Sequence, residues 1–124
     1  MNIEFIYDKY TDDGLKLPMV HFCSKNKSIC VICIHGMCGS IVDNYFATVW
    51  GKKLSQEGIG FIYEHNRGHD IENDIVMKDG GFKRIGCMYE IFEDSKYDID
   101  LAIKTAIELG YKKIILLFNG FLTE

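Results

Sequence analysis

The sequence predicts an α/β fold with a mostly parallel sheet, an N-terminal antiparallel hairpin and flanking helices. The run ICVICIH at 29–35 is apolar with almost no alternation, which is typical of a parallel strand covered on both faces, and KIILLF at 113–118 is predicted to be the last strand. Helical patterns stand between the later strands, so each helix can cross back over the sheet. The 124 residues fit one domain, 1–124.

The first two strands are expected at 2–7 and 17–23. The turn signal DDG at 12–14 lies between them, so we expect a hairpin. Pro18 has no backbone N–H to donate, which suits the start of a strand or an outer edge. The hairpin should therefore lie at one edge of the sheet.

Two helices are expected, at 43–57 and 95–110, because apolar residues recur there at three- and four-residue spacing. Ser95 and Asp98 have the spacing of a capping box at the start of the second helix. A further strand, 60–65, separates the two helices.

The long segment 66–94 is predicted to be a loop with one short helical turn near 89–92. Its first half is polar, and Gly80 and Gly81 interrupt any regular pattern. Loops of this length inside compact domains are commonly functional or mobile.

Charge and composition exclude several classes of function. The 14 Lys and Arg against 18 Asp and Glu leave a net charge of −4, which argues against nucleic-acid binding. No run approaches the roughly 20 apolar residues of a membrane span, and the N-terminus is not a signal peptide. Five cysteines without framework spacing then predict reduced thiols in a cytoplasmic protein.

The loop GMCGS at 36–40 follows the strand 29–35 and is the strongest candidate site. Ligands of α/β sheets lie at the carboxyl ends of strands. Gly36 and Gly39 would let the backbone approach a ligand, and exposed N–H groups could hold a negative oxygen. A tight turn without any ligand explains the same residues equally well.

The order and spacing of these elements resemble the α/β-hydrolase superfamily. His35-Gly36 matches the H-G dipeptide that ends the third strand of that family, and NRGHD at 66–70 resembles its R-G-x-G/D turn. By resemblance, the backbone N–H of Met37 would contribute to an oxyanion hole. The implied site consists of His35, Gly36, Met37, Cys38 and Gly39.

The resemblance also implies what this sequence lacks. In that family a G-x-S-x-G elbow carries the nucleophile directly after the strand matched here by 113–118. This chain has NGFL at 119–122, and no serine follows Ser95. It is therefore expected to be the N-terminal part of a serine hydrolase, an incomplete domain that is inactive and contains no catalytic residue. The intact parent would hydrolyse a small-molecule ester, thioester or amide and need no cofactor.

The family arrangement implies a sheet order of hairpin, 60–65, 29–35 and 113–118, which keeps the crossovers right-handed. Strand 113–118 would then be an edge with apolar side chains on both faces. Such an edge pairs readily with another strand, so self-association is predicted.

Two other classes of function stay open: a non-catalytic interaction domain, and a small phosphate- or metal-binding module. The string HNRGHD at 65–70 could bind a metal, although hydrogen bonds that fix a turn explain it better. Cys30 and Cys33 stand three apart in a strand and so face opposite sides, which predicts core residues. His21, in the hairpin, is expected to be structural. The glycine loop matches no phosphate-binding pattern.

Overall fold

The computed structural model describes residues 2–34, 45–69, 72–89 and 91–118. In chain order its elements are β1 (Ile3–Ile6), β2 (Met19–Phe22), β3 (Ile29–Ile34), α1 (Tyr45–Gln56), β4 (Gly60–Glu64), β5 (Asn73–Val76), β6 (Phe82–Ile85), the 3-10 helix η1 (Phe92–Asp94), α2 (Ser95–Glu108) and β7 (Lys113–Phe118). Neither described helix is long and apolar enough to cross a membrane.

The main sheet has the order β1-β2-β4-β3-β7, which confirms the predicted arrangement. β3 pairs in parallel with β4 on one side and with β7 on the other, so the most continuously apolar strand is central. β2 runs antiparallel to β1 and to β4, as expected for the N-terminal hairpin.

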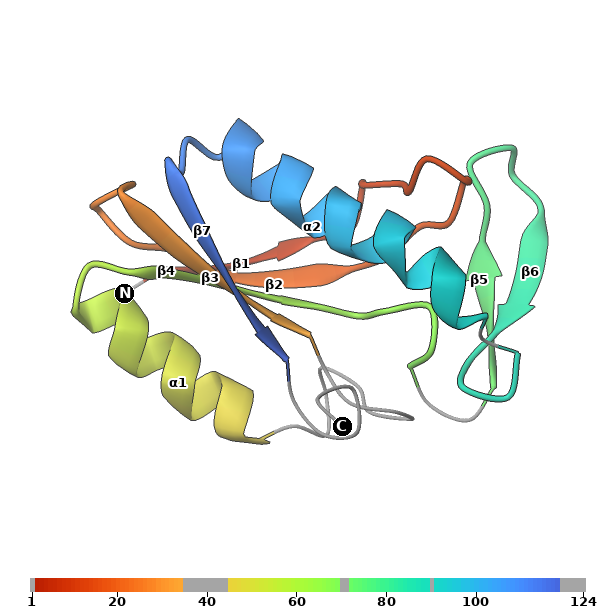
Figure 1. Ribbon diagram of the computed structural model, residues 1–124, viewed down its shortest axis with the longest axis horizontal. Helices are drawn as coiled ribbons and strands as arrows, with labels where there is room; N and C mark the ends of the chain where they lie inside the picture. Colours follow the sequence, from red (N-terminus) through yellow and green to blue (C-terminus); the bar gives the residue numbers. More distant parts are fainter. Residues whose placement is uncertain (1, 35–44, 70–71, 90, 119–124) are drawn as a thin grey trace.

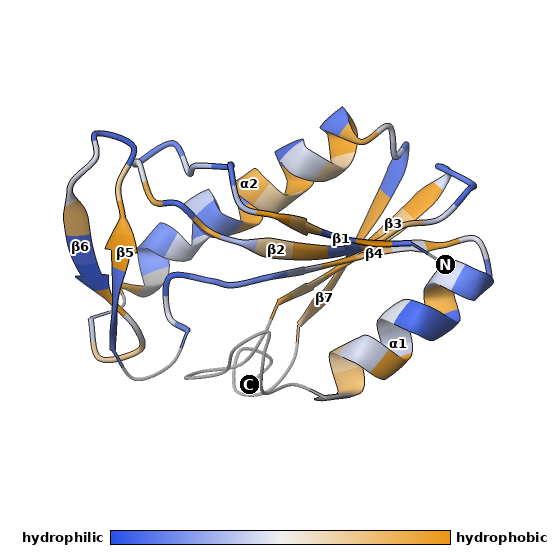
Figure 2. Cartoon of the chain, turned by 180° about the vertical axis from the view of Figure 1, so that it is seen from behind, coloured by the Kyte–Doolittle hydropathy of each residue, from blue (hydrophilic) through white to orange (hydrophobic). Residues whose placement is uncertain are grey.

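The two helices cover opposite faces of this sheet (Figure 1). The chain moves from β3 to β4 in one direction and from β4 past β3 to β7 in the other. Right-handed crossovers in opposite directions place their helices on opposite faces. The apolar residues accordingly form two clusters, one beneath α2 and one beneath α1, and Figure 2 shows the apolar strands between the helices.

The prediction for the two central cysteines is confirmed. Cys30 belongs to the cluster under α2, and Cys33 belongs to the cluster under α1. Burial raises the pKa of each thiol to about 12, so both side chains are protonated core residues.

Helix α1 approaches the sheet very closely at Gly51. A Cβ atom at this position would lie 2.5 Å from Cδ2 of Phe22. The glycine therefore lowers local helix propensity but lets α1 pack directly on the aromatic ring of β2.

The segment 66–94 differs from its prediction as a loop. It contains a second, two-stranded sheet in which β5 and β6 pair antiparallel. The connecting turn is held by a hydrogen bond of 2.8 Å from the Gly81 amide to Oδ1 of Asp79, and Gly80 takes a φ of 91°. The 3-10 turn was predicted at 89–92 and lies at Phe92–Asp94.

The capping box predicted for α2 is wrong. Asp94 is the N-cap residue, and it makes no side-chain capping hydrogen bond. Asp98 is 1% exposed and is hydrogen-bonded to Arg67 instead. A buried guanidinium needs an anionic partner, and this requirement outweighs the weaker local preference for a cap.

Candidate functional site

The carboxyl ends of the three parallel strands lie side by side. Ile34, the last residue of β3, is in register with Glu64 of β4 and with Phe118 of β7. The segments that follow these strands therefore start at the same end of the sheet, where α/β proteins commonly bind ligands. The five predicted pocket residues come directly after Ile34 and lie outside the described residues: His35, Gly36, Met37, Cys38 and Gly39.

A buried arginine organises the turn after β4. Arg67 is 4% exposed, and its Nε donates to Oδ1 of Asp98 at 2.8 Å while its backbone N–H donates to Oδ2 of the same residue at 2.9 Å. The two terminal nitrogens of Arg67 reach both oxygens of Asp13 at 2.7 and 2.9 Å. The fork of one guanidinium thus ties together α2, the β1–β2 connection and the β4 turn.

Protonation in this cluster reflects competition between burial and charge. Burial raises the pKa of Asp98 to about 6, although Arg67 works in the opposite direction. Hydrogen bonds from Arg67 lower the pKa of the more exposed Asp13. Burial disfavours the charged form of Arg67, but its bonds to Asp13 and the charge of Asp98 raise its pKa overall. Arg67 and Asp13 are therefore ionised at neutral pH.

Glu64, the last residue of β4, is a buried carboxyl group like Asp98. The residue is 0% exposed, and within the described residues neither carboxyl oxygen has a hydrogen-bond partner. Burial raises its pKa well above the ordinary value, the charge of Asp98 raises it further, and Arg67 opposes both effects. The burial of Glu64 at the end of β4 thus favours its protonated form.

The histidines of the β4 turn lie together. The rings of His65 and His69 stack with their centroids 4.0 Å apart and an angle of 10° between their planes. The His65 amide donates to the carbonyl of Pro18, and the His69 amide donates to the carbonyl of Asn66. These backbone bonds fix the turn. Among the described residues His65 and His69 form no metal-ligand cluster, and Asp70 lies outside the described residues.

The four cysteines that the structure describes divide into two groups. Cys23, Cys30 and Cys33 are free thiols, as predicted. Cys87 is disulfide-bonded, so the expectation that all cysteines are reduced is wrong for this residue.

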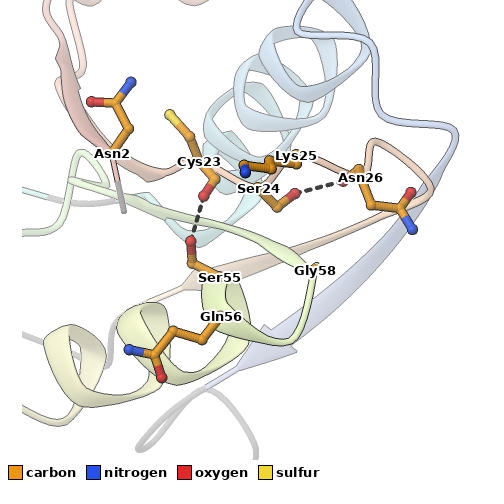
Figure 3. A pocket seen from close by; sticks show the side chains of 8 residues that line it. All are labelled: Asn2, Cys23, Ser24, Lys25, Asn26, Ser55, Gln56 and Gly58. Atoms are coloured by element: carbon orange, nitrogen blue, oxygen red, sulfur yellow. Dashed lines mark hydrogen bonds between the residues drawn. The ribbon is translucent and has the colours of Figure 1, made fainter.

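A described pocket lies at the opposite edge of the sheet (Figure 3). It has a volume of about 730 Å³ and is bordered by the N-terminal segment, the β2–β3 connection and the end of α1. Ser55 of α1 donates a hydrogen bond to the carbonyl of Cys23 across this region. The pocket lies near the amino ends of the parallel strands and is therefore separate from the predicted site.

Sequence reasoning missed the two buried carboxyl groups. A glutamate at the end of a strand is normally solvent-exposed, and nothing in the local pattern around Glu64 indicates burial. For Asp98, the only pattern in the sequence was its capping-box spacing from Ser95, which gives no indication of burial. The one available signal was Arg67, because a turn arginine that becomes buried requires acidic partners from elsewhere in the chain.

Comparison with known proteins gives structural matches only. No protein-family model matches this sequence, and no curated protein matches it. DcsB in complex with its substrate analogue matches with a TM-score of 0.70 and 12% identity, over 97% of this chain and 38% of that one. The esterase Pf2001 of Pyrococcus furiosus matches at 0.67 and 16%, over 94% of this chain and 40% of that one.

The alpha/beta hydrolase GrgF from Penicillium sp. sh18 matches with a TM-score of 0.69 and 16% identity, over 98% of this chain and 38% of that one. This chain thus spans about two fifths of the length of the structures it matches. At such identities the likeness concerns the fold. The chain has a partial α/β-hydrolase fold, in agreement with its sequence.

Proposed function

We propose that these 124 residues are the N-terminal part of a hydrolase that acts by acyl transfer on a small-molecule ester, thioester or amide. The observation that carries this proposal is that β3, β4 and β7 end side by side at one end of the sheet, in a fold shared with an esterase and a hydrolase. In acyl transfer, a serine attacks the carbonyl carbon and backbone N–H groups stabilise the resulting oxyanion.

The chain would contribute the oxyanion side of the site. Residues 35–39 follow β3 in the sequence, and Met37 would supply one N–H to the oxyanion. The bonds of Arg67 to Asp13 and Asp98 hold the neighbouring turn in place. Such anchoring matters because oxyanion stabilisation depends on donors fixed before the reaction begins.

The nucleophile would not come from residues 1–124. The strand β7 is followed by Asn119 and Gly120, and no serine occurs after Ser95. We therefore expect the chain alone to hydrolyse no ester. An oxyanion hole stabilises the intermediate that forms when a nucleophile attacks the ester, so it has no effect without a nucleophile.

The test uses the purified chain with short-chain aryl esters and a fluorophosphonate probe. We expect the esters to be hydrolysed no faster than in buffer alone, and we expect no serine to be labelled. The esterase-fold hydrolases provide the positive control for the probe. A labelled serine within residues 1–124, lost on heat denaturation, would refute the proposal that the nucleophile lies elsewhere.

A second candidate function is pairing through β7, and the exposure of this strand favours it. β7 is an edge of the described sheet, and three of its apolar side chains are exposed: Ile115 at 45%, Leu116 at 38% and Phe118 at 38%. An apolar edge with unpaired backbone groups promotes pairing with another chain. We propose a second copy of this chain as the partner.

Replacing Leu116 with Lys tests this pairing, because it places a charge where a second copy would pack. We expect the variant to be monomeric at concentrations at which the unaltered chain associates, as measured by sedimentation. Ile107→Lys is the matched control, since Ile107 is an exposed apolar residue that belongs to α2 and not to β7. An unaltered chain that stays monomeric at high micromolar concentration would contradict the proposal.

A further inference from the structure

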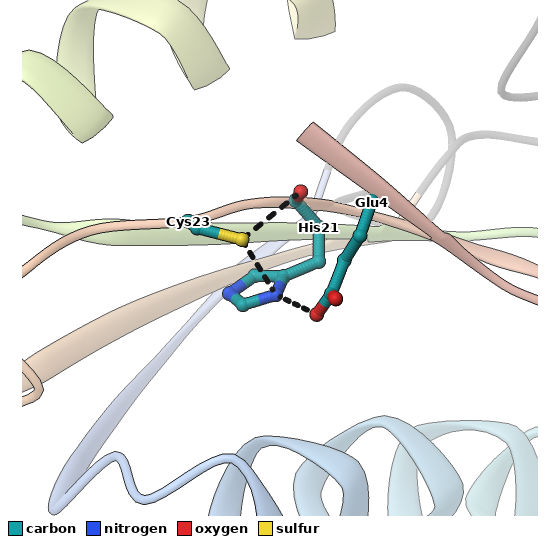
Figure 4. Close-up of side chains that lie close together, drawn as sticks. All are labelled: Glu4, His21 and Cys23. Atoms are coloured by element: carbon teal, nitrogen blue, oxygen red, sulfur yellow. Dashed lines mark hydrogen bonds and ion pairs between the residues drawn. The ribbon is translucent and has the colours of Figure 1, made fainter. Parts of the chain in front are cut away.

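Three potential metal ligands meet on the α2 face of the N-terminal hairpin (Figure 4). Glu4 of β1 is the register partner of His21 of β2, so their side chains share one face of the sheet. Cys23 follows His21 by two residues and projects to the same side. One ligand atom from each residue lies within 4.8 Å of the other two.

The contacts within this trio converge on a single nitrogen. Nδ1 of His21 lies 2.7 Å from Oε1 of Glu4 and 3.4 Å from Sγ of Cys23. The other ring nitrogen, Nε2, lies 2.7 Å from the hydroxyl of Tyr111. A thiol–imidazole–carboxylate relay would need the thiol and the carboxylate on different ring nitrogens. The arrangement therefore does not support a nucleophilic triad, whereas a metal ion requires ligand atoms grouped around one point.

We propose that Glu4, His21 and Cys23 bind a divalent ion of the zinc class through Oε1, Nδ1 and Sγ. Nitrogen, sulfur and oxygen donors together suit this borderline-soft ion, and three protein ligands leave the fourth position to water. With metal–ligand bonds of about 2.0 Å to N and O and 2.3 Å to S, tetrahedral geometry separates the ligand atoms by roughly 3.3 to 3.6 Å.

Small movements convert the observed arrangement to that geometry. The separation of 3.4 Å between sulfur and nitrogen already fits. The oxygen of Glu4 must move away from Nδ1 by about half an ångström to fit the tetrahedral spacing. Its side chain is 44% exposed and can make this adjustment, and the same exposure gives the ion a path from solvent.

Charge and protonation are compatible with cation binding. Burial lowers the pKa of His21, which keeps the imidazole neutral, the form that binds metals. Burial raises the pKa of Cys23, and the charge of Glu4 adds to this effect, so the thiol is protonated until a cation arrives. Lys27 is the nearby basic group that opposes a cation, although its charge favours the thiolate.

Binding has a defined proton balance. The thiol of Cys23 loses its proton to solvent as the sulfur–metal bond forms. The imidazole proton moves from Nδ1 to Nε2, where it is donated to the hydroxyl oxygen of Tyr111. Tyr111 is 4% exposed and its ring stands edge-on to His21, so it is placed to orient the metal-binding tautomer.

This site is independent of the proposed hydrolase function. Cys23 follows Phe22, whose register partner Phe61 stands near the amino end of β4. The predicted oxyanion loop follows the opposite, carboxyl end of β3. A result on one site therefore leaves the other untouched.

The test is titration of the tag-free, metal-free chain with Zn²⁺ and Co²⁺. We expect one ion per chain and, with Co²⁺, the near-ultraviolet charge-transfer absorption of a thiolate–metal bond. Cys23→Ser should abolish this absorption, and Glu4→Gln should weaken zinc binding at least about 10-fold. Tyr111→Phe should weaken it about 10- to 100-fold, as loss of an outer-shell partner does.

Two controls remove equivalent groups elsewhere: Glu57→Gln, at the exposed residue that follows α1, and Cys33→Ala under α1. Both should bind zinc as the unaltered chain does. Binding of less than half an equivalent, Co²⁺ binding without thiolate absorption, or unchanged zinc affinity in Glu4→Gln would each overturn the proposal. Glu4 is a partly exposed edge residue, so this last variant decides the matter even if the other variants do not fold.

Discussion

Replacing Glu64 with Gln should make the chain more stable at neutral pH. Glu64 is 0% exposed, and among the described residues neither carboxyl oxygen has a hydrogen-bond partner. Burial raises its pKa well above the ordinary value. The folded chain therefore retains a proton that the unfolded chain releases, which makes folding less favourable as the pH rises.

The sign and size follow from this difference in bound protons. Stability is unaffected below the unfolded pKa, whose ordinary value is 4.5, and it falls between that value and the raised folded pKa. The slope in this window is about 1.4 kcal/mol per pH unit, so the stability lost grows steadily as the pH rises from 4.5 towards the folded pKa. Gln has nearly the same shape and does not ionise. Its amide is as unpaired as the protonated carboxyl group, so the variant should recover this loss.

The assay is urea unfolding followed by circular dichroism at pH 4.5 and pH 7. We expect equal midpoints for Glu64→Gln and the unaltered chain at pH 4.5 and a higher midpoint for the variant at pH 7. Glu57→Gln, at an exposed position, serves as the control and should follow the unaltered chain. A variant that is less stable at pH 7 would show that Glu64 is ionised and paired in the folded chain, which would refute the reasoning.

Two further predictions concern packing and the buried ion cluster. Gly51→Ala should lower stability by about 1 to 3 kcal/mol, because the new Cβ would stand 2.5 Å from the Phe22 ring. Thr48→Ala, on the exposed side of α1, is the control, and an equal effect of both changes in thermal melts would contradict this prediction. Arg67→Met should cost about 3 to 5 kcal/mol at pH 7.5, because Asp98 is left buried without its partner. The loss should be smaller at pH 5, since the pKa of Asp98 is raised to about 6 and protonation removes the unpaired charge; the same loss at both pH values in urea unfolding would count against it.

Much of the fold was predictable because its signals are local and strong. β3 has six apolar residues in succession, which indicates a strand covered on both faces, and it is central in the sheet. The sheet order with right-handed crossovers was also predicted, and it accounts for helices on opposite faces of the sheet. The handedness of the crossover connections thus explains an arrangement of helices that residue patterns alone do not indicate.

The β5–β6 hairpin was missed because its residues give no strand pattern. NDIV at 73–76 and FKRI at 82–85 are mostly exposed and show no clear alternation of apolar and polar residues. Strands that contribute little to the core leave little periodicity in the sequence, and here the hairpin depends on its Asp79–Gly81 turn.

The predicted site residues 35–39 lie outside the described residues, so their role stays a prediction. The parallel register that brings the carboxyl ends of β3, β4 and β7 together follows from the apolar runs. The buried carboxyl groups of Glu64 and Asp98 depend on contacts between distant segments. The pairing of Glu4 with His21 likewise depends on the exact register of the hairpin, which the predicted strands 2–7 and 17–23, both longer than β1 and β2, leave undefined.

The proposal that residues 36–39 stabilise an oxyanion can be tested at the backbone amide of Met37. The measurement is the ¹⁵N–¹H spectrum of the labelled chain during titration with a small alkyl phosphonate, which carries tetrahedral oxygens like those of the acyl-transfer intermediate. The account predicts saturable shifts of the amides in 36–39, with the Met37 amide moving furthest, and smaller shifts in the adjoining turn 66–69. Shifts confined to other parts of the chain, or none at these amides at saturating phosphonate, would contradict it.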